Sequence, residues 1–404
     1  MFFITSLKAG LPCLFLFQLL YLPQNFTMEF TTPLFSEFKI PDTLSKPLHN
    51  IATKIVDGQR IDVSEAVTLY ENADLALLSQ LANLINYRIN GSNVYFNKNF
   101  HIEPTNLCVF NCKFCSYHRG ASDPLSWVLS LSDIEEQAKK YIGSDVTEVH
   151  VVGGVHPKWD IDYYGKMIKT IKNILPNIHV KAYSAIELDY VIRKAKLSYS
   201  KGLSILKEYG LDSIPGGGAE IFDHEVREKI CPDKASSEAW LQIHQAAHEL
   251  GIASNATMLY GHIESYKNRA EHMNAIRNLQ DKTGGFNSFI PLKFRSANNQ
   301  LEYLGEVNLV EDLRNFAVSR IFLDNVKHLK AYWPMLGVEN TKLAIAFGAD
   351  DIDGTIDDTT KIYSMAGAEE QKPVMTVEKL TQLIRDAGRQ PVERDSLYRI
   401  VKMY

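Results

Sequence analysis

The stretch of sequence that decides the fold runs from Phe100 to Gly120 and reads FHIEPTNLCVFNCKFCSYHRG. It places Cys108, Cys112 and Cys115 in a Cys-x3-Cys-x2-Cys array, which holds three of the five cysteines of the 404-residue chain. A strand-like run at 100–102 precedes the array, and the chain-breaking residues Pro104 and Asn106 end this run. The cysteines are therefore expected on the loop that follows a strand. A loop can point three thiolates at one centre, whereas a strand alternates its faces. The array therefore predicts one inorganic centre held by three thiolates.

Three thiolates suit a [4Fe-4S] cluster in which one iron has no protein ligand, and an open metal position is where a substrate binds. The array resembles the cluster loop of the radical S-adenosylmethionine (SAM) enzymes. This resemblance implies that the amino and carboxylate groups of SAM chelate the fourth iron. It also implies that an electron from the cluster splits SAM into methionine and a 5′-deoxyadenosyl radical, and that Tyr117 lies beside the adenine.

A structural zinc site is the alternative for the same array, with His118 as its fourth ligand. Zinc sites usually combine two ligand pairs from separate segments, and no second Cys/His pair of that kind occurs in the sequence. We therefore expect iron and sulfide in protein purified without oxygen. Zinc in a colourless protein would contradict the radical hypothesis.

The composition is that of an ordinary globular protein, with 45% hydrophobic and 23% charged residues. The net charge of -5 and the lack of a basic stripe in the sequence exclude nucleic acid as the main partner. The cysteines do not form the disulfide framework of a secreted protein, and thiolate ligands need a reducing compartment. We therefore expect a cytoplasmic protein.

An apolar run near the N-terminus, Leu11 to Leu22, is too short to span a bilayer and is followed by no small-residue cleavage site. We expect translation to begin at Met28, with residues 1–27 as a doubtful hydrophobic lead. No membrane span is expected.

The order of the expected elements predicts an α/β fold. Residues 28–97 carry helical patterns and are expected to form an N-terminal helical layer. From 98 to 348 strands alternate with helices at roughly thirty-residue spacing, which indicates parallel βαβ units and a (β/α) barrel, closed or nearly closed. The resemblance of the cysteine array implies that this is a radical SAM barrel. Leu343 to Phe347 is expected as the closing strand of this series, and 349–404 as a C-terminal capping segment.

Ligands of such barrels bind at the carboxyl ends of the strands, and several glycine and polar residues follow the expected strands. The radical SAM resemblance implies roles for them in binding SAM and substrate. These residues are Gly153 and Gly154 at the amino end of SAM, Ser184 and Glu187 at its ribose, and Asn255 and Thr257 at adenine and substrate. Each has a structural alternative, which is a plain strand-to-helix turn for the glycines and a satisfied polar group at the barrel mouth for the others.

Three other patterns fail the requirements of the motifs that they resemble. Gly216–Gly218 lacks the Lys-Ser/Thr of a phosphate loop, and we expect close backbone packing near the substrate. His244 and His248 stand one helical turn apart, but Gln245 occupies the place of a zinc protease's glutamate, so we expect a solvated helix face. The calcium-like run at 351–354 lacks its first ligand.

From about Ser64 to Arg399 the chain resembles the aminodeoxyfutalosine synthase family of radical SAM enzymes, for example at 153–157, 181–187 and 391–398. The resemblance implies that the adenosyl radical adds to the enol-ether double bond of 3-[(1-carboxyvinyl)oxy]benzoate. Rearrangement with loss of the carboxylate carbon then gives 6-amino-6-deoxyfutalosine for menaquinone biosynthesis, and SAM is consumed as a substrate. The resemblance further implies a low-potential electron donor such as flavodoxin or ferredoxin.

A dianionic substrate needs cationic or donor partners at the barrel mouth. By position alone the candidates are His156, His262, Lys293 and Arg295. Three alternatives stay open at this point: a sister enzyme (cyclic dehypoxanthinylfutalosine synthase or a deazaflavin-forming synthase), an iron–sulfur electron carrier, and a non-catalytic metal-binding module. Cleavage of SAM would distinguish a radical SAM enzyme from an electron carrier and from a metal-binding module.

Overall fold

The computed structural model describes residues 39–356, 360–369 and 372–404, and residues 40–404 form one compact unit. The hydrophobic lead at 1–27 and the expected start at Met28 lie outside the described residues. Within the described ranges, every helix is too short or too polar to cross a membrane.

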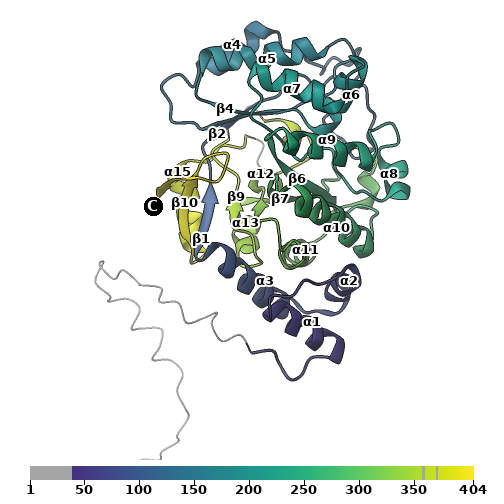
Figure 1. Ribbon diagram of the computed structural model, residues 1–404, viewed down its shortest axis with the longest axis vertical. Coiled ribbons are helices and arrows are strands. Elements are labelled where there is room, and N and C mark those ends of the chain that lie inside the picture. The colour runs from purple at the N-terminus through teal and green to yellow at the C-terminus, as the bar shows by residue number, and fades with distance from the viewer. Residues whose placement is uncertain (1–38, 357–359, 370–371) are drawn as a thin grey trace, which may run out of the picture. The chain divides into compact units, whose positions relative to one another are not determined.

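Three helices precede the sheet (Figure 1), namely α1 (Lys46–Val56), α2 (Val63–Asn72) and α3 (Leu75–Asn90). Asp62 and Asp74 begin α2 and α3, because each side chain accepts the backbone N–H of the residue three positions on. α3 packs against α11 (Leu309–Phe322), and α2 packs against α10 (Tyr266–Thr283). These helices therefore cover the outer layer of the barrel.

The barrel is built from one eleven-stranded sheet. Its strands are β1 (Asn93–Phe96), β2 (Asn99–Ile102), β3 (Glu148–Val151), β4 (His179–Ala182), β5 (Ser213–Ile214), β6 (Ala253–Tyr260), β7 (Phe286–Lys293), β8 (His328–Ala331), β9 (Asp351–Ile352), β10 (Gln390–Arg394) and β11 (Ile400–Met403). Their order is β11-β10-β1-β9-β8-β7-β6-β5-β4-β3-β2. From β2 to β9 spatial neighbours are sequence neighbours and are parallel, with helices between them, as βαβ units require.

The edge strand β2 lies next to the part of the sheet formed by β1 and β9, because β1 and β2 follow each other directly in the chain. β1 pairs with β9 and β10, whereas β2 pairs with β3. At the seam the carbonyl of Asn97 accepts the N–H of Thr355 at 3.2 Å, and the hydroxyl of Thr355 accepts the N–H of Asn99 at 3.1 Å. Only glycine fits at Gly354, since a Cβ there would lie 1.8 Å from the oxygen of Asn97. The predicted α/β barrel is confirmed.

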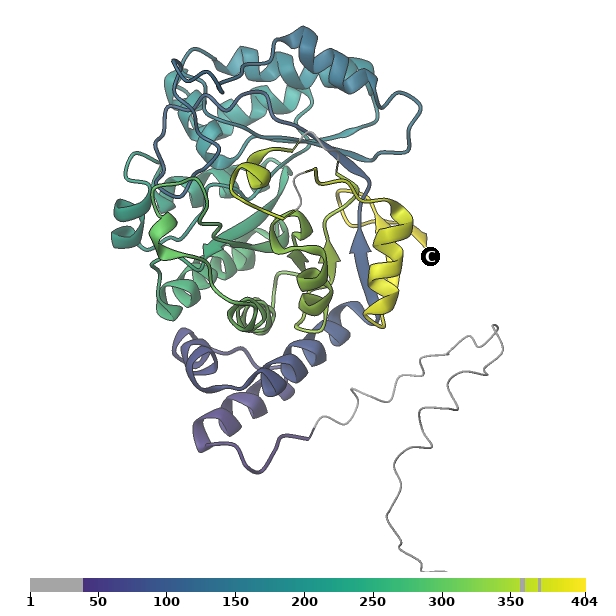
Figure 2. The same cartoon turned by 180° about the vertical axis from the view of Figure 1, so that it is seen from behind.

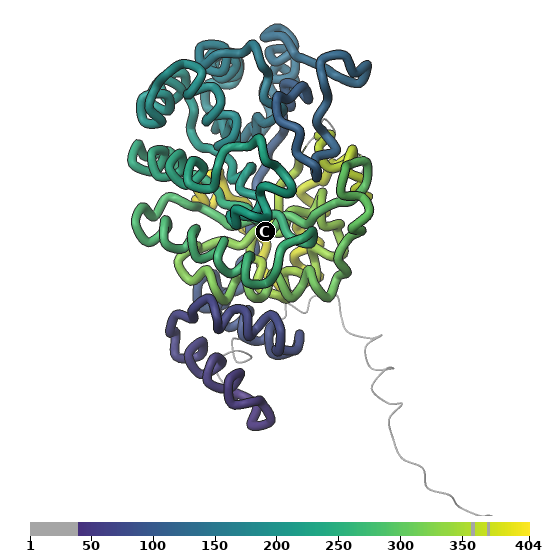
Figure 3. The backbone as a smooth tube through the Cα atoms, turned by 90° about the vertical axis from the view of Figure 1, so that its right-hand side faces the viewer, coloured from purple at the N-terminus to yellow at the C-terminus, as the bar shows by residue number. Residues whose placement is uncertain are grey.

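Helices cover the outer face of the sheet, as Figures 2 and 3 show from two further directions. Besides those above they are α4 (Leu131–Lys139), α5 (Ile161–Ile174), α6 (Ala185–Lys194), α7 (Tyr199–Tyr209), α8 (His224–Ile230), α9 (Ser237–Glu249), α13 (Val338–Ile345) and α15 (Val377–Asp386). The chain also forms α12 (Trp333–Leu336), α14 (Ile362–Met365) and the 3-10 helix Glu302–Leu304, and residues of α12 and α14 line the cavity inside the sheet. In α5, Tyr164, Met167, Ile168 and Ile171 recur on the buried face, which explains its helical form. The inside of the curl is left for the site.

The prediction of a closing strand at Leu343 to Phe347 is wrong. Thr341, Ala344 and Ile345 are buried at helical spacing within α13, and the closing strand is the two-residue β9. The boundaries expected from the sequence also shift. β1 lies in the sheet although it belongs to the expected helical layer, and the expected capping segment 349–404 supplies β9, β10 and β11.

The prediction of a solvated face for His244 and His248 is also wrong. The Nδ1 of His244 and the Nε2 of His248 each lie 2.8 Å from the hydroxyl of Ser254 on β6. His244 is fully buried and packs on Trp240, with ring centroids 3.7 Å apart. Burial lowers the pKa of His248 to about 4. Both histidines therefore belong to the core between α9 and the sheet.

Candidate active site

The three cysteines of the array lie on residues 104–119, which we call the cluster loop. The base of this loop is closed by a hydrogen bond from the N–H of Arg119 to the carbonyl of Asn106 at 2.9 Å. Its middle is tied to the end of α8, where the carbonyl of Ile230 accepts the N–H of Lys113 at 2.8 Å. The cluster loop is therefore held both at its base and at its middle.

Cys108, Cys112 and Cys115 are free thiols, of which Cys112 is buried and the other two are half-buried. Burial raises the pKa of Cys108, and it raises that of Cys112 to about 12, so burial disfavours the thiolate forms, which a bound metal centre would stabilise. In the described part of the chain, no three His, Cys, Asp or Glu side chains are set to bind one metal ion. Three soft thiols on one loop instead fit a cluster, in which each binds a separate iron.

Gly153 and Gly154, which follow β3, allow the backbone of the cluster loop to pack closely against the end of this strand. The N–H of Gly154 donates to the carbonyl of Thr105 at 2.7 Å. A Cβ at Gly153 would lie 2.6 Å from the oxygen of Thr105, and one at Gly154 would lie 2.4 Å from the oxygen of Leu107. Close approach of the loop is thus a sufficient reason for both glycines. Their contact with SAM stays a prediction.

Ser184 and Glu187 form the N-terminal cap of α6. The Oε2 of Glu187 accepts hydrogen bonds from the N–H and the hydroxyl of Ser184, both at 2.7 Å, and the N–H of Glu187 donates to that hydroxyl at 3.4 Å. Burial raises the pKa of Glu187 to about 7. A Cβ at Gly217 would lie 3.7 Å from the Cβ of Ser184. The cap therefore lies directly behind a glycine that lines the cavity described next, and its contact with the ribose stays a prediction.

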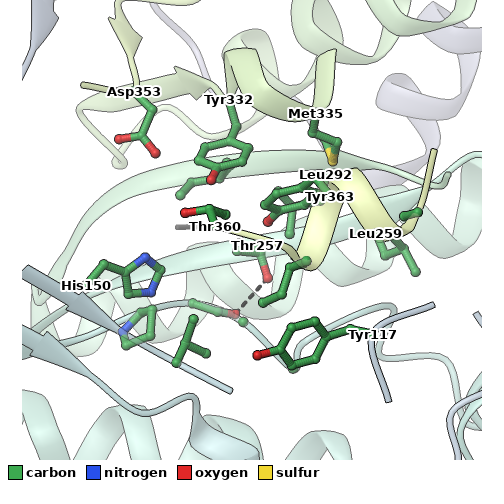
Figure 4. A pocket seen from close by; sticks show the side chains of 18 of the residues that line it. Tyr117, His150, Thr257, Leu259, Leu292, Tyr332, Met335, Asp353, Thr360 and Tyr363 are labelled. Atoms are coloured by element: carbon green, nitrogen blue, oxygen red, sulfur yellow. Dashed lines mark hydrogen bonds between the residues drawn. The ribbon is translucent and has the colours of Figure 1, made fainter. Parts of the chain in front are cut away.

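A cavity of about 280 Å³ lies inside the curl of the sheet and extends to the cluster loop. Cys115 and Tyr117 of the cluster loop line it, together with side chains of β2, β3, β4, β6, β7 and β8. Figure 4 shows Tyr117 and Leu259 toward one end of the cavity, and His150 and Asp353 toward the other. A ligand in this cavity would therefore reach from the cluster loop into the barrel.

The end of the cavity that is remote from the cluster loop is strongly polar, and we call it the polar floor. Its residues are Asn99, Glu148, His150, Lys181, Lys330 and Asp353. The ammonium of Lys181 lies 2.7 Å from the carboxylate of Glu148, and that of Lys330 lies 3.3 Å from that of Asp353. Burial, with Lys181 nearby, lowers the pKa of His150 well below its ordinary value. The polar floor thus pairs the carboxylates of Glu148 and Asp353 with the ammonium groups of Lys181 and Lys330, beside the neutral imidazole of His150.

Asn255 and Thr257, which were expected near adenine and substrate, both line the cavity from β6. The hydroxyl of Thr257 donates to the carbonyl of Gly216 at 2.7 Å. A Cβ at Gly216 would lie 2.7 Å from the oxygen of Asn255, so the close backbone packing predicted for this glycine run is present beside the cavity.

Two of the four cationic candidates, Lys293 and Arg295, line the cavity. Lys293 lies 2.9 Å from the carboxylate of Asp312, and Arg295 lies 3.3 Å from that of Glu306. Each cation is therefore already partnered, which limits the positive charge that it offers to a ligand.

The other two candidates, His156 and His262, do not line the cavity. His156 stacks on Trp159 with ring centroids 4.5 Å apart. The Nδ1 of His262 lies 3.1 Å from the carboxylate of Glu264, and its Nε2 lies 3.1 Å from the carbonyl of Leu259. The geometry favours neither histidine as a substrate contact.

Glu103 ties the C-terminal segment to the cavity. Its carboxylate accepts the N–H of Lys361 at 3.1 Å and that of Ile362 at 3.3 Å. Burial raises the pKa of Glu103 to about 7, against the opposite effect of these two donors. Because Thr360, Ile362 and Tyr363 line the cavity, Glu103 fixes one of its walls.

Sequence reasoning missed the polar residues inside the barrel. Asn99, His101 and Glu103 occupy alternate positions of β2 and its end, and Glu148 and His150 occupy alternate positions of β3. Parallel strands that are buried on both faces are usually apolar. Polar residues at every second position of such strands therefore indicate an interior site, and this pattern was available in the sequence.

Comparison with known proteins agrees with this arrangement. The Radical SAM superfamily matches residues 102–276, and the CofH/MqnC C-terminal region matches 283–404. Two similar proteins are named aminodeoxyfutalosine synthase: that of Thermus thermophilus is 42% identical over 88% of this chain and 96% of its own length, and that of Streptomyces coelicolor is 39% identical over 87% and 93%. A 5-amino-6-(D-ribitylamino)uracil--L-tyrosine 4-hydroxyphenyl transferase of Methanopyrus kandleri is 37% identical over 78% of this chain and 87% of its own.

Among solved structures, methylornithine synthase has a similar fold, with a TM-score of 0.68 over 84% of this chain and 97% of that chain at 15% identity. The chain belongs to the radical SAM superfamily, as its cluster loop and barrel indicate. It is a radical SAM enzyme whose sequence is similar, over most of its length, to the aminodeoxyfutalosine synthases.

Proposed function

We propose that the enzyme joins the 5′-deoxyadenosyl group of SAM to the enol-ether carbon chain of 3-[(1-carboxyvinyl)oxy]benzoate and releases 6-amino-6-deoxyfutalosine. The bond between C5′ and sulfur breaks and releases methionine, and a bond between C5′ and the vinyl methylene forms. The aryl group then moves from the ether oxygen to the adjacent carbon, the bond from that carbon to the carboxylate breaks to release carbon dioxide, and the former ether oxygen becomes the ketone oxygen. No net electrons are consumed, because the electron that opens the reaction returns when carbon dioxide leaves, and the charges of SAM and the dicarboxylate balance those of the products. The supporting observation is the 42% identity to a synthase over 96% of that protein's length.

Cys108, Cys112 and Cys115 would hold the [4Fe-4S] cluster, which when bound would supply the opening electron. The chain's own part is to bring both substrates together and to exclude water. Cys115 and Tyr117 line the cavity, which supports a reacting end beside the cluster loop. Leu259 and Leu292 give the cavity apolar walls, which protect a reactive intermediate from solvent.

SAM is proposed to occupy the carboxyl ends of β2 to β6. The residues assigned to it are those expected from the sequence, namely Tyr117, Gly153, Gly154, Ser184, Glu187, Asn255 and Thr257. Tyr117, Asn255 and Thr257 line the cavity, which supports their assignment. Gly153, Gly154 and the α6 cap would act through the loop and turn that they hold.

The experiment that tests this function uses anaerobically reconstituted, reduced enzyme with SAM and the enol-ether benzoate, and the products are identified by mass. An adduct that joins the adenosyl and aryl groups supports the proposal. Free 5′-deoxyadenosine as the sole adenosyl product would indicate a hydrogen-abstracting sister enzyme, such as cyclic dehypoxanthinylfutalosine synthase or a deazaflavin-forming synthase. Unchanged SAM would indicate an electron carrier or a binding module.

The proposed electron donor is a flavodoxin or ferredoxin of low potential, and the proposed compartment is the cytoplasm, because cluster thiolates need reducing surroundings. Turnover with reduced flavodoxin in place of a chemical reductant tests the choice of donor.

A further inference from the structure

Among the residues that line the cavity, His150 and Thr360 each carry a buried polar atom without a partner in the described part of the chain, namely the Nε2 of His150 and the hydroxyl of Thr360. Figure 4 shows both side chains on the same side of the cavity as Asp353, away from Tyr117 and Leu259. Buried polar atoms in proteins nearly always have hydrogen-bond partners. Two orphaned atoms from β3 and from the C-terminal segment therefore point to a polar group of a ligand at the polar floor.

The lysines of the polar floor retain donors for such a group. An ammonium carries three N–H donors. Lys181 makes one hydrogen bond, to Glu148, and Lys330 makes one, to Asp353, with a second carboxylate, that of Asp351, at 3.6 Å. Both ammonium groups therefore keep at least one donor for a further acceptor in the cavity.

The charge balance of the polar floor selects the ligand group. Glu148 and Asp353 offset Lys181 and Lys330, so the floor has little net charge to spare. A phosphate dianion would meet two carboxylates without excess cations, whereas a carboxylate spreads one charge over two acceptor oxygens. Hydroxyl, imidazole and ammonium donors on several sides of one acceptor fit a single carboxylate.

Apolar side chains line the same cavity as the polar floor and the cluster loop. Ile290, Leu292 and Ile362 are among them, and they provide a surface against which an aromatic ring can pack. A ligand that carries a carboxylate on a ring therefore fits with the carboxylate on the floor and the other ring substituent toward Cys115 and Tyr117.

We propose that His150, Thr360 and Lys330 form a subsite for the benzoate carboxylate of the substrate, which turns the enol-ether double bond toward the cluster loop. This subsite rests on the proposed function for the identity of the ligand. These residues position the substrate and take no part in the bond changes.

The test compares two unreactive ligands by calorimetry on the reconstituted full chain with SAM. One is 3-(1-carboxyethoxy)benzoate, and the other is 2-phenoxypropanoate, which lacks only the ring carboxylate. The unchanged enzyme is expected to bind the first roughly 30-fold more tightly, as charge-assisted hydrogen bonds suggest. Equal affinity for the two ligands would overturn the subsite.

The variants Lys330→Met and Thr360→Val are expected to lose most of this preference while binding 2-phenoxypropanoate as the unchanged enzyme does. Lys169→Met is the control, because Lys169 is exposed on α5 and undergoes the same change. Thr360→Val keeps the side-chain shape, so this variant alone tests the subsite if Lys330→Met does not fold. A preference that survives in Thr360→Val overturns the subsite.

Product analysis of the unchanged enzyme keeps the two proposals distinguishable. If the adduct forms and the variants keep the preference, the subsite fails and the proposed function stands. If no adduct forms and the variants lose the preference, the proposed function fails and a carboxylate subsite for another aryl ligand stands.

Discussion

The N–H of Gly154 donates to the carbonyl oxygen of Thr105 at 2.7 Å, which joins the end of β3 to the start of the cluster loop. A Cβ on Gly154 would lie 2.4 Å from the oxygen of Leu107, which is backbone and has no rotamer to change. The position of the first cysteine, Cys108, therefore depends on the absence of a side chain one strand away.

Gly154→Ala is expected to displace the cluster loop and to lower the iron content of the reconstituted protein by about tenfold or more, as loss of supporting contacts does at metal sites. Gly120→Ala is the matched control, because a Cβ there meets nothing within 4 Å. Iron and sulfide analysis of both variants checks this. Normal iron content in Gly154→Ala would show that the loop tolerates the shift.

Cys112→Ala is expected to lose both the cluster and all turnover, because two thiolates do not hold a four-iron cluster in place. Cys231→Ala provides the comparison, since Cys231 is also a buried free thiol but lies outside the array. The visible absorption of the cluster and the cleavage of SAM are the measurements. Full activity in Cys112→Ala would refute the assignment of the array.

Glu103→Gln is expected to flatten the pH dependence of stability. The pKa of Glu103 is raised from 4.5 to about 7, so its ionised form is disfavoured in the fold and the free energy of unfolding falls as pH rises through this window. Glutamine keeps an acceptor for the N–H groups of Lys361 and Ile362. Relative to that of the unchanged protein, the free energy of unfolding of the variant should rise by up to about 3 kcal/mol from the low-pH end to the high-pH end of this window.

Denaturant unfolding at several pH values measures that difference. The comparison of variant and unchanged protein cancels the titration of other groups, such as the buried histidines. A difference that is constant with pH, or that changes in the opposite direction, would contradict the raised pKa of Glu103.

Asp350→Ala is expected to destabilise the fold by about 3–5 kcal/mol, because it leaves the buried guanidinium of Arg320 without its counter-ion. Asp350 also lies 2.6 Å from Nδ1 of His328 and accepts the N–H of Leu329 at 2.7 Å. Thermal unfolding is the measurement, with the exposed pair Glu135 and Lys139 as the contrast. Glu135→Ala should leave the transition unchanged.

The parts of the fold and site that depend on local sequence were predictable. The Cys108, Cys112 and Cys115 array needs only its own spacing to indicate a three-thiolate centre. The stripe of α5 likewise needs only fourteen consecutive residues to show one buried helical face. Both features were therefore predicted without knowledge of the rest of the chain.

The parts that depend on distant contacts were not predictable in the same way. Glu103 meets Lys361 across 258 positions, and β9 consists of two residues whose strand form comes from pairing with β1 and β8. The polar floor exists only because the sheet curls until side chains of β2, β3 and β4 line the same cavity as Lys330 of β8 and Asp353 after β9. The burial of His244 follows from the strand beneath α9, which a helix pattern alone does not reveal.

The most direct test of the central claim is electron paramagnetic resonance of the anaerobically purified, reduced protein before and after addition of SAM, with iron and sulfide counted in the same sample. The account predicts about four irons and four sulfides per chain and a spectrum that changes when SAM is added, as expected for a cluster with one open iron. Zinc in place of iron, or a cluster spectrum that SAM leaves unchanged, would contradict it.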